Sequence, residues 1–355
     1  MKPTALSILV LLGFTAVLGA QSTPKESLLA LSKRDHTVAI VDPATLKVLA
    51  KVPVGEDPHE VVASTDGTTA YVSNYGGGAY NTIAVIDLIN QKQLASIDLG
   101  AMRGPHGLMF VAGKLWFTAE VADVIGSYDP ATRKIDWILG TGQNRTHMIW
   151  VSDDAKRMVT TNVNAGTVSM IEKAAPRPAG PPPGAPRGAP AGASQGPRGP
   201  WGPPGGTWDQ TVVRVGNGDE GFDVSPDGKS IWVANAQDGT ISIIDVATRK
   251  VTETVSANAR GANRLKFTPD GSRVFVSTLS TGDLVILDAG TRKEIKRINL
   301  GHGAAGIQMQ PDGARAFVGC SPDNYVAVVD LKSLEVTGHL DVGTEPDGLA
   351  WSVRH

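Results

Sequence analysis

The sequence has little of what stabilises small secreted folds or attracts polyanions. It contains one cysteine, Cys320, among 355 residues, which excludes a disulfide within the chain. Aromatic residues make up only 5% of the chain, so its core must consist mainly of Val, Ile, Leu and Ala. The formal net charge of −2 gives no reason to expect nucleic acid or an anionic membrane as a partner. A large closed core needs no disulfides, so their absence does not argue against export.

An apolar run at the amino-terminal end is typical of a secretory signal peptide. Lys2 supplies a positive charge, Leu6–Val17 supplies the apolar segment, and Gly19 and Ala20 are the small residues before a cleavage point. The run is too short for a comfortable membrane span. We therefore expect residues 1–20 to be a signal peptide. The mature chain should then be exported, to the periplasm, the cell surface or the medium, without a transmembrane segment.

A short pattern recurs along the rest of the chain: an apolar run, an acidic residue, a turn segment and basic residues. Ile241–Lys250 (ISIIDVATRK) is its clearest copy. The acidic residues of the copies are Asp42, Asp87, Asp129, Glu172, Asp245, Asp288 and Asp330. They are separated by 45, 42, 43, 73, 43 and 42 positions, where 73 is one period plus an insertion of about thirty residues. A period near 43 with strand-like content predicts a β-propeller.

Each period accommodates four short strands, separated by turns such as Pro226-Asp227-Gly228. The first strands begin at His59, His106, His147, Glu220, Asn263, Ala305 and Asp347, which gives seven blades. The last of these strands lies at the carboxyl end of the sequence. Three strands stand unassigned before the first blade: Leu28–Ser32, Thr37–Asp42 and Lys47–Val52.

These positions predict an all-β fold over residues 21–355, a seven-bladed β-propeller with four antiparallel strands per blade. The last blade would combine the carboxyl-terminal strand with the three amino-terminal strands. Such a blade closes the ring through main-chain hydrogen bonds and leaves no open sheet edge. Neither end would form a stable blade alone.

Residues 174–209 interrupt the third blade between its third and fourth strands. They hold 11 of the 23 prolines, and a segment of this Pro- and Gly-rich composition cannot bury a core. We expect a disordered insertion. It is either a tolerated surface loop or a docking segment for a Pro-recognising partner, with Trp201 and Trp208 as anchors.

The second strands carry a recognisable sequence. They read YVSN at Tyr71–Asn74, IWVAN at Ile231–Asn235 and FVST at Phe275–Thr278. With the pairs Pro58-His59 and Pro105-His106, this resembles the YVTN-repeat β-propellers of bacterial exported proteins, over nearly all of residues 28–355 apart from the insertion. More distantly, the chain is similar to lactonase propellers and to the propeller chains of quinoprotein dehydrogenases. The resemblance implies the fold and leaves the function open, because these families include surface proteins, binding proteins and enzymes.

The starts of the first strands should form a ring around one mouth of the central channel. Three successive blades place a histidine there and the fourth places a glutamate, a set that suits Zn, Cu or Fe. The candidate metal ligands are His59, His106, His147 and Glu220. The candidate ligand-binding residues are these four with Asn263, Asp347, Arg103, Arg145 and Arg264. The ends of the second strands should reach the same mouth, at Asn74, Glu120, Asn162 and Asn235.

The same residues permit other roles. The imidazoles could act as acid–base groups, or the ring could be purely structural, with histidines bonding to turn carbonyls. The leading interpretation is an exported, monomeric, non-catalytic propeller that binds a small polar or anionic ligand, or a protein partner, at the channel mouth. One alternative is a metal-assisted or His/Glu-dependent hydrolase or lyase acting on a lactone-like substrate. Another is a cell-surface scaffold or adhesion protein that uses the Pro-rich loop. A divalent metal is the only cofactor that the sequence suggests.

Overall fold

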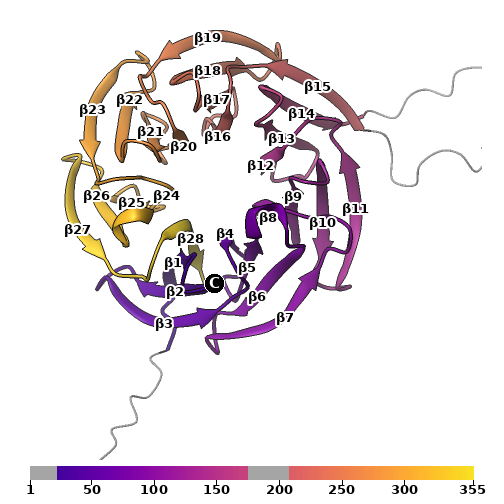
Figure 1. The fold of residues 1–355 in the computed structure, drawn as a ribbon, viewed down its shortest axis with the longest axis vertical. Coiled ribbons are helices and arrows are strands. Elements are labelled where there is room, and N and C mark those ends of the chain that lie inside the picture. Colours follow the sequence, from indigo (N-terminus) through magenta and orange to yellow (C-terminus); the bar gives the residue numbers. More distant parts are fainter. Residues whose placement is uncertain (1–21, 175–207) are drawn as a thin grey trace, which may run out of the picture.

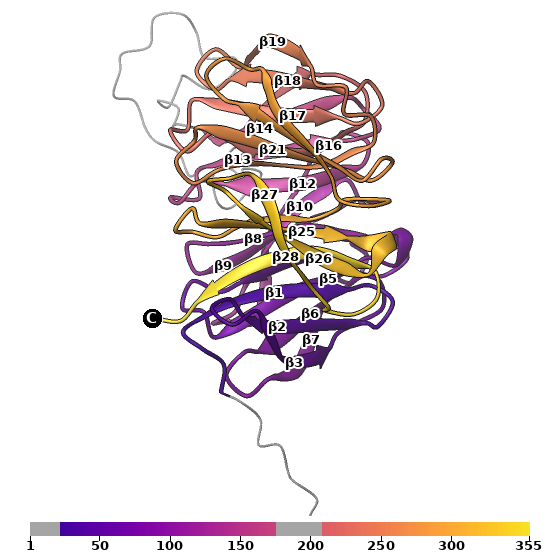
Figure 2. The ribbon, with the colours of Figure 1, turned by 90° about the vertical axis from the view of Figure 1, so that its left-hand side faces the viewer.

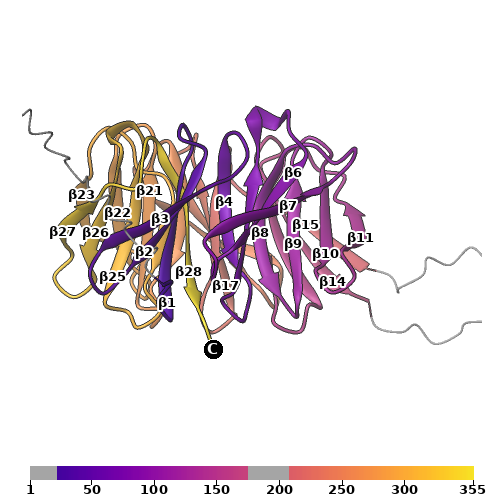
Figure 3. The same cartoon turned by 90° about the horizontal axis from the view of Figure 1, so that it is seen from below.

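The computed structural model describes residues 22–174 and 208–355 as seven four-stranded antiparallel sheets in a ring around a central channel (Figure 1). Seen from the side, the ring is a short cylinder (Figure 3). The all-β, seven-bladed prediction is therefore confirmed. The predicted signal peptide and most of the predicted insertion lie outside the described residues. Within these two ranges, no helix has the length and apolar character needed to cross a membrane.

The strands in chain order are β1 (Glu26–Ser32), β2 (Thr37–Asp42), β3 (Lys47–Pro53), β4 (Pro58–Ala63), β5 (Thr69–Asn74), β6 (Thr82–Asp87), β7 (Lys92–Asp98), β8 (Pro105–Val111), β9 (Lys114–Ala119), β10 (Val124–Asp129), β11 (Lys134–Gly140), β12 (Thr146–Val151), β13 (Arg157–Asn162), β14 (Thr167–Lys173), β15 (Trp208–Arg214), β16 (Asp219–Val224), β17 (Ser230–Asn235), β18 (Thr240–Asp245), β19 (Lys250–Ser256), β20 (Ala262–Phe267), β21 (Arg273–Thr278), β22 (Asp283–Asp288), β23 (Glu294–Asn299), β24 (Ile307–Met309), β25 (Arg315–Cys320), β26 (Tyr325–Asp330), β27 (Glu335–Leu340) and β28 (Pro346–Val353). Two short 3-10 helices follow β5 and β25: η1 (Gly76–Gly78) and η2 (Ser321–Asp323).

We number the blades from 1 to 7. Blades 1 to 6 are four consecutive strands each, beginning at β4, β8, β12, β16, β20 and β24, and the first strand of each blade lines the channel (Figure 1). Blade 7 has the order β28-β1-β2-β3. The predicted strand boundaries agree with the structure to within two residues. Strand β15 begins at Trp208, and β24 begins at Ile307, so Ala305 stands just before its strand.

Blade 7 joins the two ends of the described chain. The carboxyl-terminal strand β28 runs antiparallel to β1, with Leu28 opposite Trp351 and Leu29 opposite Ala350, and the two strands lie side by side in Figure 2. Leu28 and Leu29 are fully buried. The predicted closure of the ring is therefore confirmed.

The core lies between neighbouring blades. Phe317 of blade 6 packs in one buried cluster with Leu28 and Val41 of blade 7, and Trp232 of blade 4 packs against Phe267 of blade 5. The inner strands of a blade are covered on both faces, and β2 is accordingly buried over four consecutive positions. The outer strand β11 instead alternates between half-buried and exposed residues, as a strand with one solvated face does.

The repeated acidic residue anchors the turn between the third and fourth strands. The Asp245 carboxylate accepts the backbone N–H of Thr248 at 2.7 Å, and Arg249 then takes a left-handed conformation with φ of 56°. The Asp288 turn repeats this geometry. Aspartate favours such turns because its side chain bonds to the backbone two or three residues later. The repeat is thus a turn signal, which explains why it marks the period so well.

Glycines on the inner strands allow neighbouring blades to approach closely. A Cβ on Gly221 would lie 2.6 Å from the Asn263 carbonyl oxygen and from the Arg264 Cα. Gly107, Gly306 and Gly348 face the backbone of the next inner strand in the same way. We therefore expect Gly221→Ala to destabilise the fold by about 2 kcal/mol or more, because backbone atoms cannot move aside locally. Thermal unfolding measures this effect.

Gly140→Ala is the matched control for that experiment. Gly140 is also a strand residue, but a Cβ there meets nothing within 4 Å and its φ is not positive. Its replacement should leave the melting temperature unchanged or raise it slightly. Equal melting temperatures for the two variants would contradict the proposed backbone contact.

Candidate metal centre at the channel mouth

A cavity of about 420 Å³ opens at one mouth of the channel. Every blade or its loops contribute to the wall, which consists of Lys33, His59, Tyr75, His106, Arg145, His147, Glu220, Asn263, Arg264, Leu279, Ala305, Ser321, Pro322, Glu345 and Asp347. The structure brings eight of the nine candidate residues together here. Arg103 is the exception: its side chain is exposed and its Nε donates to the Ala79 carbonyl at 3.2 Å. It is therefore not one of the residues that line this cavity.

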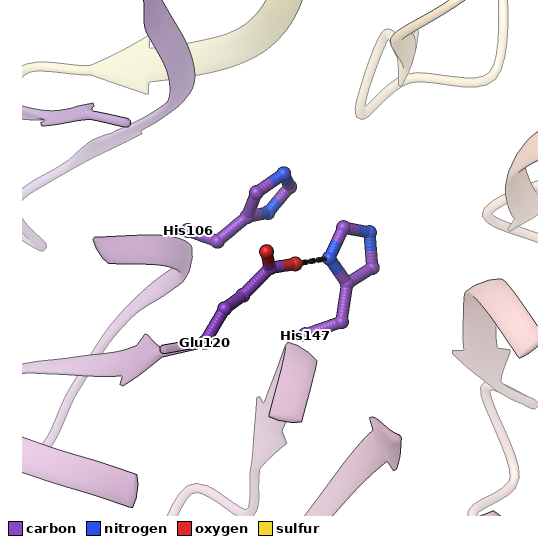
Figure 4. Close-up of side chains that lie close together, drawn as sticks. All are labelled: His106, Glu120 and His147. Atoms are coloured by element: carbon purple, nitrogen blue, oxygen red, sulfur yellow. Dashed lines mark hydrogen bonds and ion pairs between the residues drawn. The ribbon is translucent and has the colours of Figure 1, made fainter. Parts of the chain in front are cut away.

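Three buried side chains from blades 2 and 3 form a potential metal site. His106 and His147 stand near the starts of β8 and β12, and Glu120 directly follows β9. One ligand atom from each residue lies within 4.8 Å of those of the other two. In Figure 4 the Glu120 carboxylate points into the space between the two imidazoles. Two imidazoles and one carboxylate are a donor set that suits Zn or Fe.

His59 and Glu220 are not part of this group, in contrast to the sequence prediction. The Nδ1 atom of His59 lies 3.2 Å from the Asp57 carbonyl oxygen, and its Nε2 lies 3.0 Å from Lys33 Nζ. An ammonium group only donates, so Nε2 must accept and the ring proton is on Nδ1. Both nitrogens of His59 are therefore occupied by the protein itself.

Glu220 instead holds the far side of the His147 ring. Its carboxylate lies 2.9 Å from His147 Nε2, while Glu120 bonds to Nδ1. Burial alone would lower the pKa of His147, but its close contacts with the carboxylates of Glu120 and Glu220 outweigh that effect and raise it. Burial likewise acts to raise the pKa of Glu220, yet the contact with His147 and the charge of Arg145 bring it down to about 2. Both nitrogens of His147 thus face a carboxylate, and a metal ion bound by this imidazole would displace one of its ring protons.

The pKa of His106 is shifted in the opposite direction. Its side chain is 2% exposed, and its ring centroid lies 4.0 Å from that of His147. Burial, followed by the charge of His147, places the pKa of His106 well below the usual histidine value, so the ring is neutral. Its Nδ1 has no hydrogen-bond partner among the described residues. A buried polar atom without a partner is costly, and a metal or ligand would satisfy it.

Charged side chains of both signs surround the mouth. The cations are Lys33, Arg145 and Arg264, and the carboxylates are Asp57, Glu60, Glu120, Glu220 and Asp347. Burial raises the pKa of the neighbouring Asp219 to about 7, so this residue can only add negative charge. Most of these charges are paired within the protein: Arg145 lies beside Glu120 and Glu220, Arg264 beside Glu60, and Lys33 beside Asp57 and Asp347.

Tyr75 contacts two of the three candidate metal ligands, Glu120 and His106. Its hydroxyl donates to the Glu120 carboxylate at 2.5 Å, and its ring centroid lies 5.2 Å from that of His106. We expect Tyr75→Phe to weaken metal binding about 10-fold, since partners that orient a ligand contribute this much. Isothermal titration with Zn²⁺ measures the change. Tyr80→Phe is the control: Tyr80 also bonds to a carboxylate, that of Glu56, but outside the cavity, and its loss should leave the affinity unchanged.

The strand register explains why Glu120 was not among the predicted metal ligands. Ala119 pairs with Pro105 just as Asn74 pairs with Pro58, so Glu120 stands one position beyond the aligned asparagines. A shift of one residue turns a side chain to the other face of a strand. Asn74, Asn162 and Asn235 bond within their own blades and do not line the cavity, which corrects that part of the prediction. Glu120 is instead equivalent to Tyr75.

Solved structures with the same architecture have low sequence identity to this chain. A functionally unknown protein from Desulfotomaculum acetoxidans superposes with a TM-score of 0.71 at 15% identity, covering 93% of this chain and 99% of that one. A candidate 6-phosphogluconolactonase from Bacteroides fragilis gives 0.69 at 14%, covering 93% and 99%. Dihydro-heme d1 dehydrogenase, in complex with DHE, gives 0.62 at 14%, covering 93% and 75%. These likenesses show the propeller fold alone.

Sequence comparisons add one partial match. The Cytochrome D1 heme domain family matches residues 205–308, less than a third of the chain. A comparison with curated protein sequences finds no match. The YVTN-repeat family is not among these findings, so that resemblance stays a prediction.

The matched segment does not carry a buried heme ligand. Its one histidine is His302, whose side chain is 85% exposed and bonds to Asp323 at 2.6 Å. The three imidazoles at the mouth, those of His59, His106 and His147, all precede the segment. The match therefore reflects the blade framework, and the residues within it do not fit an axial ligand.

Proposed function

We propose that the channel mouth binds one divalent transition-metal ion through His106, Glu120 and His147, and that the protein is a metal-assisted hydrolase or lyase. The observation that carries this proposal is the approach of three buried ligand atoms to within 4.8 Å. Buried titratable groups are rarely left in such a cluster unless they bind or react with something. The unpartnered Nδ1 of His106 supports a cation at this place.

The surroundings support a centre with oriented ligands. Tyr75 and Arg145 contact Glu120, and Glu220 holds the His147 ring. Such outer contacts fix the direction of each ligand and tune its basicity. A metal bound there would supply Lewis acidity, polarising a carbonyl group or activating water.

The rest of the cavity wall provides space for a substrate and a hydrogen-bonded Lys33–His59 pair. Asn263, Ala305 and Ser321 are small or uncharged and leave room for the body of a substrate. The Lys33 ammonium donates to His59 Nε2 at 3.0 Å. A small, uncharged, lactone-like molecule suits this lining. The fold of the candidate 6-phosphogluconolactonase makes a lactone a sensible first substrate to test.

The test is metal analysis followed by activity screening. Purified mature protein should contain close to one Zn, Fe, Mn or Cu per chain, or take it up after reconstitution. The loaded protein should then hydrolyse or open a member of a panel of small lactones, and EDTA should abolish that turnover. Protein that takes up none of these metals would contradict the proposal.

Non-catalytic ligand binding is the second candidate. It is favoured by the extensive internal pairing of the charges at the mouth: Lys33 lies 3.4 Å from Asp57 and 3.5 Å from Asp347. Charged side chains that are already paired with each other are better suited to orienting a bound ligand than to transferring protons. Stoichiometric metal without turnover on any lactone of the panel would favour this function. Export and a monomeric state belong to both proposals.

A further inference from the structure

An ion pair crosses the channel below the mouth. Arg264 on β20 of blade 5 and Glu60 on β4 of blade 1 are 204 positions apart, yet their side chains form a salt bridge. Their side chains are only 5% and 13% exposed. Arg264 lines the mouth cavity on one side and a second cavity on the other. The pair therefore separates the channel into two compartments.

The second compartment, which we call the lower cavity, also measures about 420 Å³. The inner strands or their ends from all seven blades form its wall. Its character differs from that of the mouth, because large apolar side chains dominate: Leu108, Met109, Met148, Trp150, Phe222 and Trp351. Cavities of a few hundred Å³ with apolar and aromatic walls are typical of sites for small organic molecules. Sulfur and aromatic groups adapt well to a flat apolar ligand.

The lower cavity also has an incompletely paired cation. Asp223 accepts the backbone N–H of Phe267 at 3.0 Å and that of Val224 at 3.1 Å. Lys266 Nζ lies 3.7 Å from the Asp223 carboxylate, beyond hydrogen-bond distance. Its side chain is 39% exposed, so the ammonium can reach a ligand without losing a strong partner.

We propose that the lower cavity is a second binding site, for a small organic anion with an aromatic body. The apolar body would lie among Met148, Trp150 and Trp351, and the acid group would face Lys266. The inner strands of all seven blades surround the site, and its volume suits a small molecule, so a folded protein partner does not fit inside it. The proposal is independent of the metal centre, since the Arg264–Glu60 pair stands between the two cavities.

The experiment compares two fluorescent probes of similar shape on the full-length mature protein. One is the anion 8-anilinonaphthalene-1-sulfonate, and the other is uncharged N-phenyl-1-naphthylamine. We expect saturable one-to-one binding of the anionic probe, tighter than that of the uncharged probe, and unaffected by EDTA. Lys266→Gln should lower the affinity for the anionic probe about 5-fold, because one partly exposed ion pair contributes this factor. The affinity for the uncharged probe should be unchanged. Lys229→Gln, which removes an exposed lysine of blade 4, is the matched control.

A second variant tests the apolar part of the site. Val62→Glu places a carboxylate in the wall of the lower cavity and should weaken both probes at least about 10-fold. Ile138→Glu makes the same change on the exposed face of β11 and should have no effect. Absence of saturable binding, or wild-type affinity in both cavity variants, would overturn the site. Equal affinity for the two probes in the unaltered protein would overturn its preference for anions.

Discussion

His106→Ala is expected to leave the purified protein without its metal, with the affinity for Zn²⁺ lowered by about 100-fold or more. Loss of a group that merely orients a ligand costs 10- to 100-fold, so loss of the ligand itself should cost at least the upper value. The variant should fold, because the alanine replaces a neutral side chain that has an unsatisfied nitrogen. Metal content by mass spectrometry, and competition with a chelating dye, measure the two quantities.

Two histidine variants complete this experiment. His302→Ala removes an exposed imidazole at the surface and should retain full metal binding. His59→Ala distinguishes the two possible ligand sets, because His59 belongs to the ring of first-strand histidines but not to the group of three. Since Asp57 and Lys33 already occupy its nitrogens, we expect this variant to bind metal like the unaltered protein. Metal lost from the His59 variant and kept by the His106 variant would reverse the assignment.

The sequence was sufficient to predict the fold because its repeat is a turn. Asp245 and its equivalents anchor the same loop in each blade, and this chemistry fixes the spacing of the strands. The composition of blade 7 could be predicted by counting strands, because one strand remained unassigned at the carboxyl end and three at the amino end. The predicted start of the first strand of blade 6, at Ala305, lies two residues before the observed start. This strand has only three residues, and Gly306 packs against the backbone at Asp347.

The site was less predictable because it depends on side-chain direction across blades. Equivalent positions predicted that His59, His106 and His147 would meet at the mouth, and their rings do so, with centroids 5.1 Å and 4.0 Å apart along this series. Glu120 was placed near them, but its role depends on a register that differs by one residue from that of the aligned asparagines. The Arg264–Glu60 pair joins nonadjacent blades, and no sequence spacing links residues whose contact arises only when the ring closes.

Ring closure itself leads to the other large expected effect. Removal of Thr344–His355 deletes β28, and we expect the shortened chain to show no cooperative thermal transition and to aggregate. Without β28, the whole length of β1 becomes an exposed edge, and the buried Leu28 and Leu29 lose the strand that covers them. Removal of His355 alone, an exposed residue after the strand, should have no measurable effect on circular dichroism or melting.

A circular permutant separates closure from mere loss of residues. Glu26 pairs with Val353, so a short linker can join the ends of β28 and β1 and make blade 7 continuous. New termini in the exposed loop at Asn258, between blades 4 and 5, would leave every blade with its four strands. We expect this permutant to melt cooperatively, in contrast to the shortened chain. Cooperative melting of the shortened chain would show that six blades and a three-stranded remnant are stable without closure.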